Sequence, residues 1–446
     1  MSYIPNTDAD RAEMLSAIGV ESLDDLFTPI PKRLQYNQEL EIPARMDQIT
    51  LAKHLNRLAA KNVHAEAYPC FLGAGIYDHY VPPTVAAITG RSEFYTSYTP
   101  YQPEVSQGML QSIFEFQTLL CQLLAMDVAN ASMYDGATAL AEAAIMAAEL
   151  TGRRRVTVLN SVHPSYRQVL KTYLRHVGIA IDLIADTGGL GDFTVSDEAA
   201  AVIVQHPNFF GTLEDMEQFG QAAHAKGALL VACVDPISLG ILTPPGEYDA
   251  DIVVGEGQAL GCPMGYGGPL LGFFACKTKF MRRLPGRIVG QTTDGDGKRA
   301  FVMTLRTREQ DIRRERATSN ICTNEALYAL AASVYLATMG RKGLTQVAEL
   351  CIQKAHYAAS EIAKLPGYSL AFPDQPFFKE FVVKTPRNTA EINEKLMEQG
   401  IIGGLALNDL YPELDDAMLL CVTEQRTKEE IDALVSALGS LSEREL

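Results

Sequence analysis

The segment 251-DIVVGEGQALGCPMGYGGPLLGFFACK-277 decides how the rest of this chain is interpreted. Two apolar runs, Ile252–Val254 and Leu270–Ala275, flank a stretch that contains six glycines. Apolar runs separated by glycines predict a strand, a tight loop and a second strand. Loops of this kind occur where a backbone approaches a ligand closely, and they also occur in purely structural hairpins. The segment alone leaves both interpretations open.

The residues before this segment alternate between short apolar runs and helical patterns. The expected strands are Val156–Leu159, Ile179–Ile184, Ala201–Val204 and Ala228–Val234, and the expected helices are Ser165–Val177 and Leu213–Lys226. Strands that alternate with helices predict an α/β fold with a parallel, doubly wound sheet.

Composition excludes several classes of protein. The chain has 446 residues, 47% of them hydrophobic, and a formal net charge of −16, which argues against nucleic acid or an anionic membrane surface as a partner. The eight cysteines are scattered without metal-ligand spacing, so we expect reduced thiols, no metal and a cytoplasmic protein. We find no signal-peptide pattern and no apolar run of the roughly 18 residues that a membrane span needs.

Three polar residues follow expected strands: His163, Asn208 and Asp235. Ligands of doubly wound sheets bind just beyond the carboxyl ends of strands. An imidazole can stack on a pyridine ring, and a carboxylate can pair with a pyridinium N–H. Gly136 and Thr138 open an alanine-rich helix, whose free N–H groups could hold a phosphate. Each residue alone could be a turn or cap residue, but the series favours a ligand site.

The run Tyr95-Thr-Ser-Tyr98-Thr-Pro-Tyr101-Gln-Pro-Glu104 combines three tyrosines with two prolines. Proline restricts the residue before it to extended conformations, so a helix through this run is not expected. The segment is either a packed interface loop or a set of phenols and a carboxylate that line a substrate entrance.

The C-terminal part predicts a small α/β lobe. The charge-rich run Arg306–Arg316 is expected to form a solvated helix face. The expected later elements are helices at Thr323–Met339, Leu344–Leu365, Thr389–Gln399 and after Thr427, and strands at Glu380–Lys384, Ile401–Leu405 and Ala417–Val422.

Several motifs together resemble the glycine cleavage system P-protein family, and in particular the first (α) subunit of its two-chain bacterial form. They are GIYDHYVPP (75–83), YTPYQPEVSQG (98–108), YDGATA (134–139), GYGGP (265–269) and RATSNICT (316–323). The resemblance implies fold type I of the pyridoxal-phosphate (PLP)-dependent transferases, the aspartate aminotransferase-like fold. The expected domains are a helical arm at 1–70, a large mixed or parallel sheet domain at 71–330 and a smaller C-terminal α/β domain at 331–446.

In the lysine-bearing subunit of that family, the lysine that binds PLP lies eleven residues before the proline of Gly-Gly-Pro. Counting back from Pro269 leads to Gln258, and no lysine occurs between Lys226 and Lys277. The resemblance therefore implies a degenerate PLP pocket that keeps its other positions and has lost the lysine. These positions are Gly136, Thr138, His163, Asp235 and Gln258, with Thr318, Ser319 and Asn320 at an interface shared with the neighbouring subunit.

The implied activity is that of glycine dehydrogenase (decarboxylating). PLP is expected on the partner β subunit, in an α2β2 assembly, and the aminomethyl group of glycine is expected to pass to the lipoyl group of H-protein. Tyr95, Tyr98, Tyr101 and Glu104 are expected to be contributed to the partner's site, and the helical arm to wrap a neighbouring subunit. Two alternatives remain at this point, an autonomous PLP enzyme and a non-catalytic scaffold for the β subunit.

Overall fold

The computed structural model describes residues 5–36, 38–184 and 194–442. It divides into two compact units, Met1–Val63 and His64–Leu446. The first unit contains helices α1 (Asp8–Ile18) and α2 (Gln48–Ala59) and no strand among its described residues. The hydroxyl of Thr7 accepts a hydrogen bond from the third residue of α1, as an N-cap does. None of the described residues of this unit is buried.

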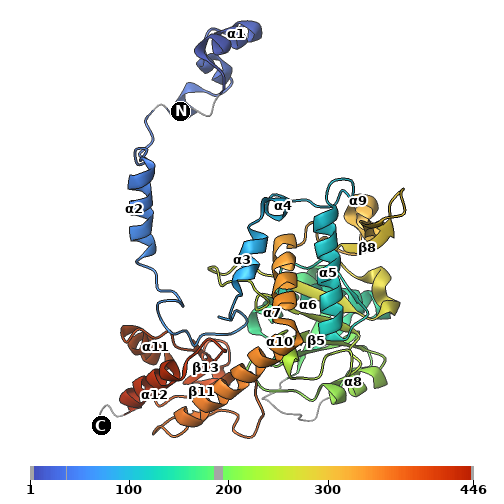
Figure 1. The fold of residues 1–446 in the computed structure, drawn as a ribbon, viewed down its shortest axis with the longest axis vertical. Coiled ribbons are helices and arrows are strands. Elements are labelled where there is room, and N and C mark those ends of the chain that lie inside the picture. Colours follow the sequence, from blue (N-terminus) through green and yellow to red (C-terminus); the bar gives the residue numbers. More distant parts are fainter. Residues whose placement is uncertain (1–4, 37, 185–193, 443–446) are drawn as a thin grey trace. The chain divides into compact units, whose positions relative to one another are not determined.

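The second unit is built on a large sheet that includes β5 (Figure 1). This sheet has seven strands in the order β1-β7-β6-β5-β4-β2-β3. Its strands are β1 (Val128–Ala129), β2 (Arg155–Leu159), β3 (Ala180–Ile184), β4 (Ala201–His206), β5 (Leu229–Val234), β6 (Ile252–Glu256) and β7 (Gly272–Cys276). Strands β3, β2, β4, β5 and β6 are parallel, while β7 is antiparallel to both β6 and β1. The predicted alternation and the predicted strand–loop–strand are confirmed, and the hairpin makes the sheet mixed.

Helices pack on this sheet to form the large lobe. They include α5 (Gln107–Leu124), α6 (Gly136–Thr151), α7 (Pro164–Val177) and α8 (Met216–Ala225), with the short α3 (Pro83–Thr89) and α4 (Ser92–Tyr95) before them. Helix α6 packs across β5, β6 and β7. Its alanines are small and fully buried, so the helix axis lies close to the sheet. The start of α6 is thereby placed beside the end of β6.

The small lobe is a four-stranded antiparallel sheet with three helices. Its elements are the end of α10 (Ala326–Ile362), β10 (Ser369–Leu370), β11 (Glu380–Lys384), α11 (Thr389–Glu398), β12 (Leu405–Ala406), β13 (Ala417–Cys421) and α12 (Lys428–Ser442). Helix α10 links the lobes and merges the two helices that the sequence predicts, with a kink at Gly340 (Figure 1). The predicted strand Ile401–Leu405 is wrong except at its last residue. Ile402 instead forms an isolated bridge with Cys70, since its N–H donates to the carbonyl oxygen of Pro69 and its own carbonyl oxygen accepts from Phe71.

Two further differences concern the region before α10. A hairpin of β8 (Ile288–Thr293) and β9 (Arg299–Thr304), joined by a polar turn at 294–297, was not expected from the sequence. The expected solvated helix at 306–316 is also wrong, because only α9 (Gln310–Arg313) is α-helical and Arg308 is buried. No helix in the described ranges is both long enough and apolar enough to span a bilayer.

Candidate functional site

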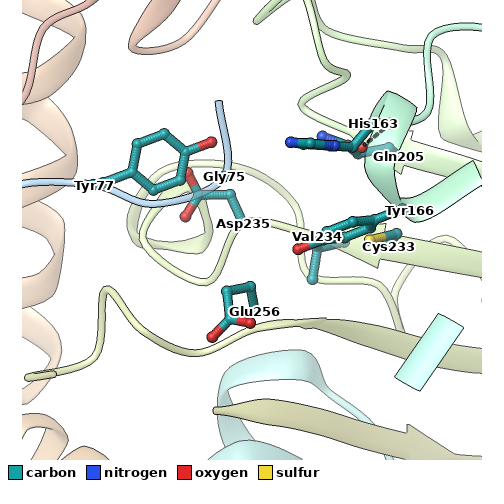
Figure 2. A pocket seen from close by; sticks show the side chains of 9 residues that line it. All are labelled: Gly75, Tyr77, His163, Tyr166, Gln205, Cys233, Val234, Asp235 and Glu256. Carbon is teal, nitrogen blue, oxygen red and sulfur yellow. Dashed lines mark hydrogen bonds between the residues drawn. The ribbon is translucent and has the colours of Figure 1, made fainter. Parts of the chain in front are cut away.

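Two of the predicted ligand-site residues, His163 and Asp235, line one small pocket at the carboxyl ends of the parallel strands (Figure 2), and Gly136, Thr138 and Gln258 are not among its lining residues. His163 follows β2, Asp235 follows β5 and Glu256 ends β6. The remaining lining residues are Gly75, Tyr77, Tyr166, Gln205, Cys233 and Val234. The cavity has a volume of about 30 Å³. Asn208 does not line it, since its side chain bonds Glu214 and the backbone of its own turn.

His163 is fully hydrogen-bonded within the chain. Its Nε2–H donates to the carbonyl oxygen of Ala74 at 2.8 Å, and its Nδ1 accepts from the backbone N–H of Ser165 at 3.1 Å. Burial lowers the pKa of His163, which agrees with this neutral tautomer. The Tyr166 ring stacks on the imidazole with centroids 4.8 Å apart and planes at 24°. A phenol of the chain itself therefore covers a face of the predicted stacking residue.

Asp235 is paired with a lysine from the small lobe. One carboxylate oxygen accepts from the N–H of Ile237 at 3.0 Å, and the other lies 2.6 Å from Nζ of Lys379. Lys379 is only 2% exposed. Burial alone would lower the pKa of Lys379, but the Asp235 carboxylate holds it above its ordinary value. An ammonium thus faces the carboxylate that was expected to meet a pyridinium.

The start of α6, predicted to hold a phosphate, is occupied by the side chain of Glu256. The N–H of Gly136 donates to Oε2 of Glu256 at 3.0 Å, and Oε1 accepts from Gln258 and Leu271 at 2.9 Å each. Burial raises the pKa of Glu256 to about 7, against the effect of these three N–H groups. Thr138 serves as the N3 residue of a capping box with Asp135.

Gln258 is buried, and both ends of its amide are bonded. Oε1 accepts from the N–H of Tyr77 at 3.0 Å, while Nε2 donates to the carbonyl oxygens of Tyr77 at 3.1 Å and Cys262 at 2.7 Å. An amide nitrogen is not nucleophilic enough to condense with an aldehyde, because only a primary amine does so readily. The amide of Gln258 therefore holds the backbone of Tyr77 in place through two hydrogen bonds.

We tested whether these residues fit PLP, as the fold implies. A ligand of that size needs a pocket of about 300–1,000 Å³. The cavity of about 30 Å³ has room for little more than one or two waters. The groups that would anchor the ring, the phosphate and the aldehyde are already bonded to other parts of the chain. The residues of this chain therefore do not fit the cofactor.

The tyrosine-rich segment lies outside this pocket. Tyr95 and Tyr98 are 68% and 80% exposed, and Glu104 is also exposed. Tyr101 is anchored, because its hydroxyl donates to Asn324 at 3.0 Å and the guanidinium of Arg287 lies 3.7 Å from its ring centroid. The segment therefore presents two free phenols beside a fixed one.

The stretch predicted at a shared interface is attached to α6. The hydroxyl of Ser319 donates to Oε1 of Glu142 at 2.8 Å, and burial raises the pKa of Glu142 to about 7. Thr318 bonds through its N–H to the carbonyl oxygen of Arg308, while Asn320 is exposed. Sequence reasoning did not identify Lys379, Tyr166 or Glu256 as site residues. Glu256 could have been found, since it directly follows an apolar run in the glycine-rich segment.

Comparison with solved structures defines the class of protein. The sphingosine-1-phosphate lyase of Burkholderia pseudomallei superposes with a TM-score of 0.63 at 15% identity, over 92% of this chain and 94% of that one. The mixed seven-stranded sheet and the small antiparallel sheet are those of fold type I of the PLP-dependent transferases.

Closer relatives identify the family. The family model described as glycine cleavage system P-protein matches residues 1–438. A probable glycine dehydrogenase (decarboxylating) subunit 1 from Desulforamulus reducens is 55% identical over 99% of this chain and all of its own length. The crystal structure of an inhibitor-bound glycine decarboxylase (P-protein) of the glycine cleavage system superposes with a TM-score of 0.91 at 45% identity, over 99% of this chain and 100% of that one. The chain belongs to the glycine cleavage system P-protein family.

Proposed function

We propose that this chain is the subunit of glycine dehydrogenase that holds no PLP, and that it completes the site of its partner. The cofactor resides on subunit 2 (β) in a cytoplasmic α2β2 assembly, and the lipoyl group of H-protein accepts the aminomethyl group. Two observations support this division. Gln258, and not a lysine, lies eleven residues before Pro269, and the surrounding groups are bonded to side chains of the chain itself.

The observation that carries the proposal is the surface of the Tyr95–Glu104 segment. Two exposed phenols, Tyr95 and Tyr98, precede a tyrosine that is held by Asn324 and Arg287. Large aromatic side chains that are exposed together mark surfaces that another molecule covers. A segment with one fixed end can present its phenols and the Glu104 carboxylate in a defined geometry, as orientation of a small amino acid requires.

These groups suit glycine as a substrate. A carboxylate accepts hydrogen bonds from an ammonium group, and phenol hydroxyls donate to a carboxylate. We assign the orientation of glycine, or the lining of the channel for the lipoyl arm, to the segment as a whole. Loss of one orienting hydrogen bond from such a site lowers kcat/KM on the order of 10²-fold, about 2.7 kcal/mol.

The helical arm is proposed to wrap the partner subunit. Its described residues include many large apolar side chains that are more than two-fifths exposed. They are Met14, Ile18, Leu23, Leu26, Phe27, Ile30, Leu34, Tyr36, Leu40, Ile42, Met46, Ile49, Leu51, Leu55, Leu58 and Val63. An apolar surface this extensive is a site of protein association in a stable protein.

The test compares the variants Tyr95→Phe, Tyr98→Phe, Tyr101→Phe and Glu104→Gln with Tyr357→Phe. Tyr357 is the control because its hydroxyl bonds Asp432 within the small lobe. Each variant is mixed with wild-type subunit 2, assembly is checked by size-exclusion chromatography, and glycine–bicarbonate exchange is measured with H-protein. We expect intact assembly in every case and reduced exchange in the segment variants alone. Normal exchange in all four segment variants would refute the shared site and leave the scaffold function.

A further inference from the structure

A buried row of four polar side chains crosses the boundary between the lobes. It runs from Asp235 to Lys379 (2.6 Å), then to Nε2 of His79 (2.9 Å), and from Nδ1 of His79 to Glu424 (2.7 Å). The four side chains are between 1% and 12% exposed. An ammonium has donors only, so Nε2 of His79 accepts from Lys379 and Nδ1–H donates to Glu424. Every link of the row therefore has a donor and an acceptor.

The members of the row come from four separate segments of the chain. Asp235 follows β5 of the large lobe, Lys379 precedes β11 of the small lobe, and Glu424 lies beyond β13. His79 belongs to the 73–80 segment, which lies between the lobes and leads through α3 and α4 to Tyr95. The row thus joins both lobes through this segment.

Further contacts hold the 73–80 segment in place. The ammonium of Lys379 lies 3.5 Å from the ring centroid of Tyr77, whose hydroxyl donates to Oε2 of Glu380 at 2.8 Å. Oε1 of Glu380 accepts from the N–H of Ala74 at 2.6 Å. A side chain at Gly73 would come within 2.4 Å of the same carboxylate, so only glycine fits there without a shift.

We infer that this chain has converted the cofactor pocket of its fold into a lock that excludes PLP and fixes the two lobes against each other. Each anchoring position has a substitute within the chain. Lys379 replaces the pyridinium at Asp235, Glu256 replaces the phosphate at the start of α6, and the amide of Gln258 replaces the lysine. The Tyr166 ring stacks on His163. The 73–80 segment closes the remaining space.

The lock disfavours separation of the lobes. Moving the small lobe away would part Lys379 from Asp235 and break their ion pair at 2.6 Å. Breaking a buried ion pair by removing one member commonly shifts a conformational equilibrium on the order of 10²-fold or more. The frame that carries the Tyr95–Glu104 segment is consequently held in one arrangement.

The far end of the row also contains groups of the kind that bind metals. Ligand atoms of His79, Cys351 and Glu424 lie within 4.8 Å of one another. However, Nδ1 of His79 is bonded to Oε2 of Glu424, and the thiol of Cys351 lies 3.4 Å from the same oxygen. The Lys379 ammonium contacts the other ring nitrogen. These atoms are satisfied as part of the lock without a cation.

The first experiment tests exclusion of the cofactor. Pyridoxine 5′-phosphate is titrated into the full-length wild-type chain in a calorimeter. This probe keeps the ring and the phosphate but has no aldehyde, so surface lysines cannot trap it. We expect no saturable binding. Stoichiometric binding that Asp235→Asn abolishes would overturn the inference.

The second experiment tests the fixing of the lobes by amide hydrogen exchange. Lys379→Met is compared with Lys277→Met, because Lys277 pairs with Asp251 at 2.9 Å entirely within the large lobe. We expect Lys379→Met to accelerate exchange in the 73–80 segment, β11 and β13 on the order of 10²-fold, and Lys277→Met to leave these segments unchanged. Unchanged exchange in Lys379→Met would overturn the lock.

Asp235→Asn serves as the milder variant if Lys379→Met does not fold, since its amide oxygen can still accept from Lys379. It should accelerate exchange in the same three segments. The lock and the shared site of the proposed function fail separately. The lock fails if the probe binds or if the exchange rates do not change, while the shared site fails if the tyrosine-segment variants exchange glycine normally.

Discussion

Replacing Glu142 by glutamine should make the chain more stable above neutral pH and leave its stability nearly unchanged in mild acid. Glu142 lies on α6, is 8% exposed and accepts a hydrogen bond from Ser319. Burial raises the pKa of its carboxyl from the ordinary value of 4.5 to about 7, and the charge of Glu149 raises it slightly further. Tyr173 on α7 is a further titratable neighbour.

The sign of the effect follows from linkage. Because the pKa of Glu142 is raised in the folded state, the neutral carboxyl stabilises the fold below about pH 4.5, and this contribution disappears as the pH rises through about 7. The difference in pKa corresponds to at most about 3 kcal/mol. Glutamine keeps the acceptor for Ser319 and never ionises. Glu142→Gln should therefore exceed the wild type in free energy of unfolding by up to about 3 kcal/mol at pH 8, and by little at pH 5.

The assay is urea unfolding at both pH values, followed by circular dichroism and tyrosine fluorescence, since the chain has no tryptophan. Glu256 and Glu380, whose pKa values burial also raises to about 7, titrate in the same range in both proteins. Their effects cancel when the pH-dependent change of the variant is subtracted from that of the wild type. The exposed Glu115→Gln is the control. A variant with the pH profile of the wild type, or one less stable at pH 8, would refute the reasoning.

Three other substitutions or deletions have defined expected results. Gly211→Ala should destabilise the chain by about 2–5 kcal/mol in urea unfolding, because φ at Gly211 is +84° and a Cβ would lie 1.9 Å from the carbonyl oxygen of Glu380. The control Gly297→Ala, at φ +79° with open space around the Cβ, should destabilise the chain by only about 1 kcal/mol. Deletion of residues 1–63 should leave the thermal midpoint of the second unit unchanged and abolish co-elution with subunit 2. Retained co-elution would show that the helical arm is not the segment that binds subunit 2. Gln258→Lys should destabilise the chain by about 1–3 kcal/mol, because three hydrogen bonds of the amide are lost. Borohydride reduction of this variant with PLP should leave no adduct at residue 258, and a stoichiometric adduct found by mass spectrometry would contradict this expectation.

Local patterns were sufficient to predict six of the seven strands of the large sheet, and the two-residue β1 was not expected. The apolar runs of β2, β4, β5, β6 and β7 are buried along nearly their whole length, so their sequences differ sharply from the turns between them. The hairpin β8–β9 was missed for the opposite reason. The second half of β8, Gln291–Thr293, is polar and exposed, and the sequence there has no apolar run to recognise.

From the sequence, only those site residues that directly follow a predicted strand could be found. His163 and Asp235 were found because functional residues follow parallel strands, and both line the pocket. Lys379 could not be found in this way, because it belongs to another lobe and no local feature distinguishes it from a surface lysine. Its burial depends on long-range pairing with Asp235 and His79, which only the tertiary structure reveals.

The loss of a buried cofactor creates an energetic problem that one substitution does not solve. A fold of this type without PLP has four positions that lack their partner. They are the carboxylate of Asp235, the N–H groups at the start of α6, an imidazole and the lysine position. Each unsatisfied buried group costs about 1–3 kcal/mol, and a charged group costs more. Total stability is only about 5–15 kcal/mol, so a chain that leaves all four unpaired is close to unfolding. Here Lys379, Glu256, Tyr166 and Gln258 occupy all four positions. Because the four side chains act together, introducing a lysine at Gln258 alone would open one position and leave the other three closed.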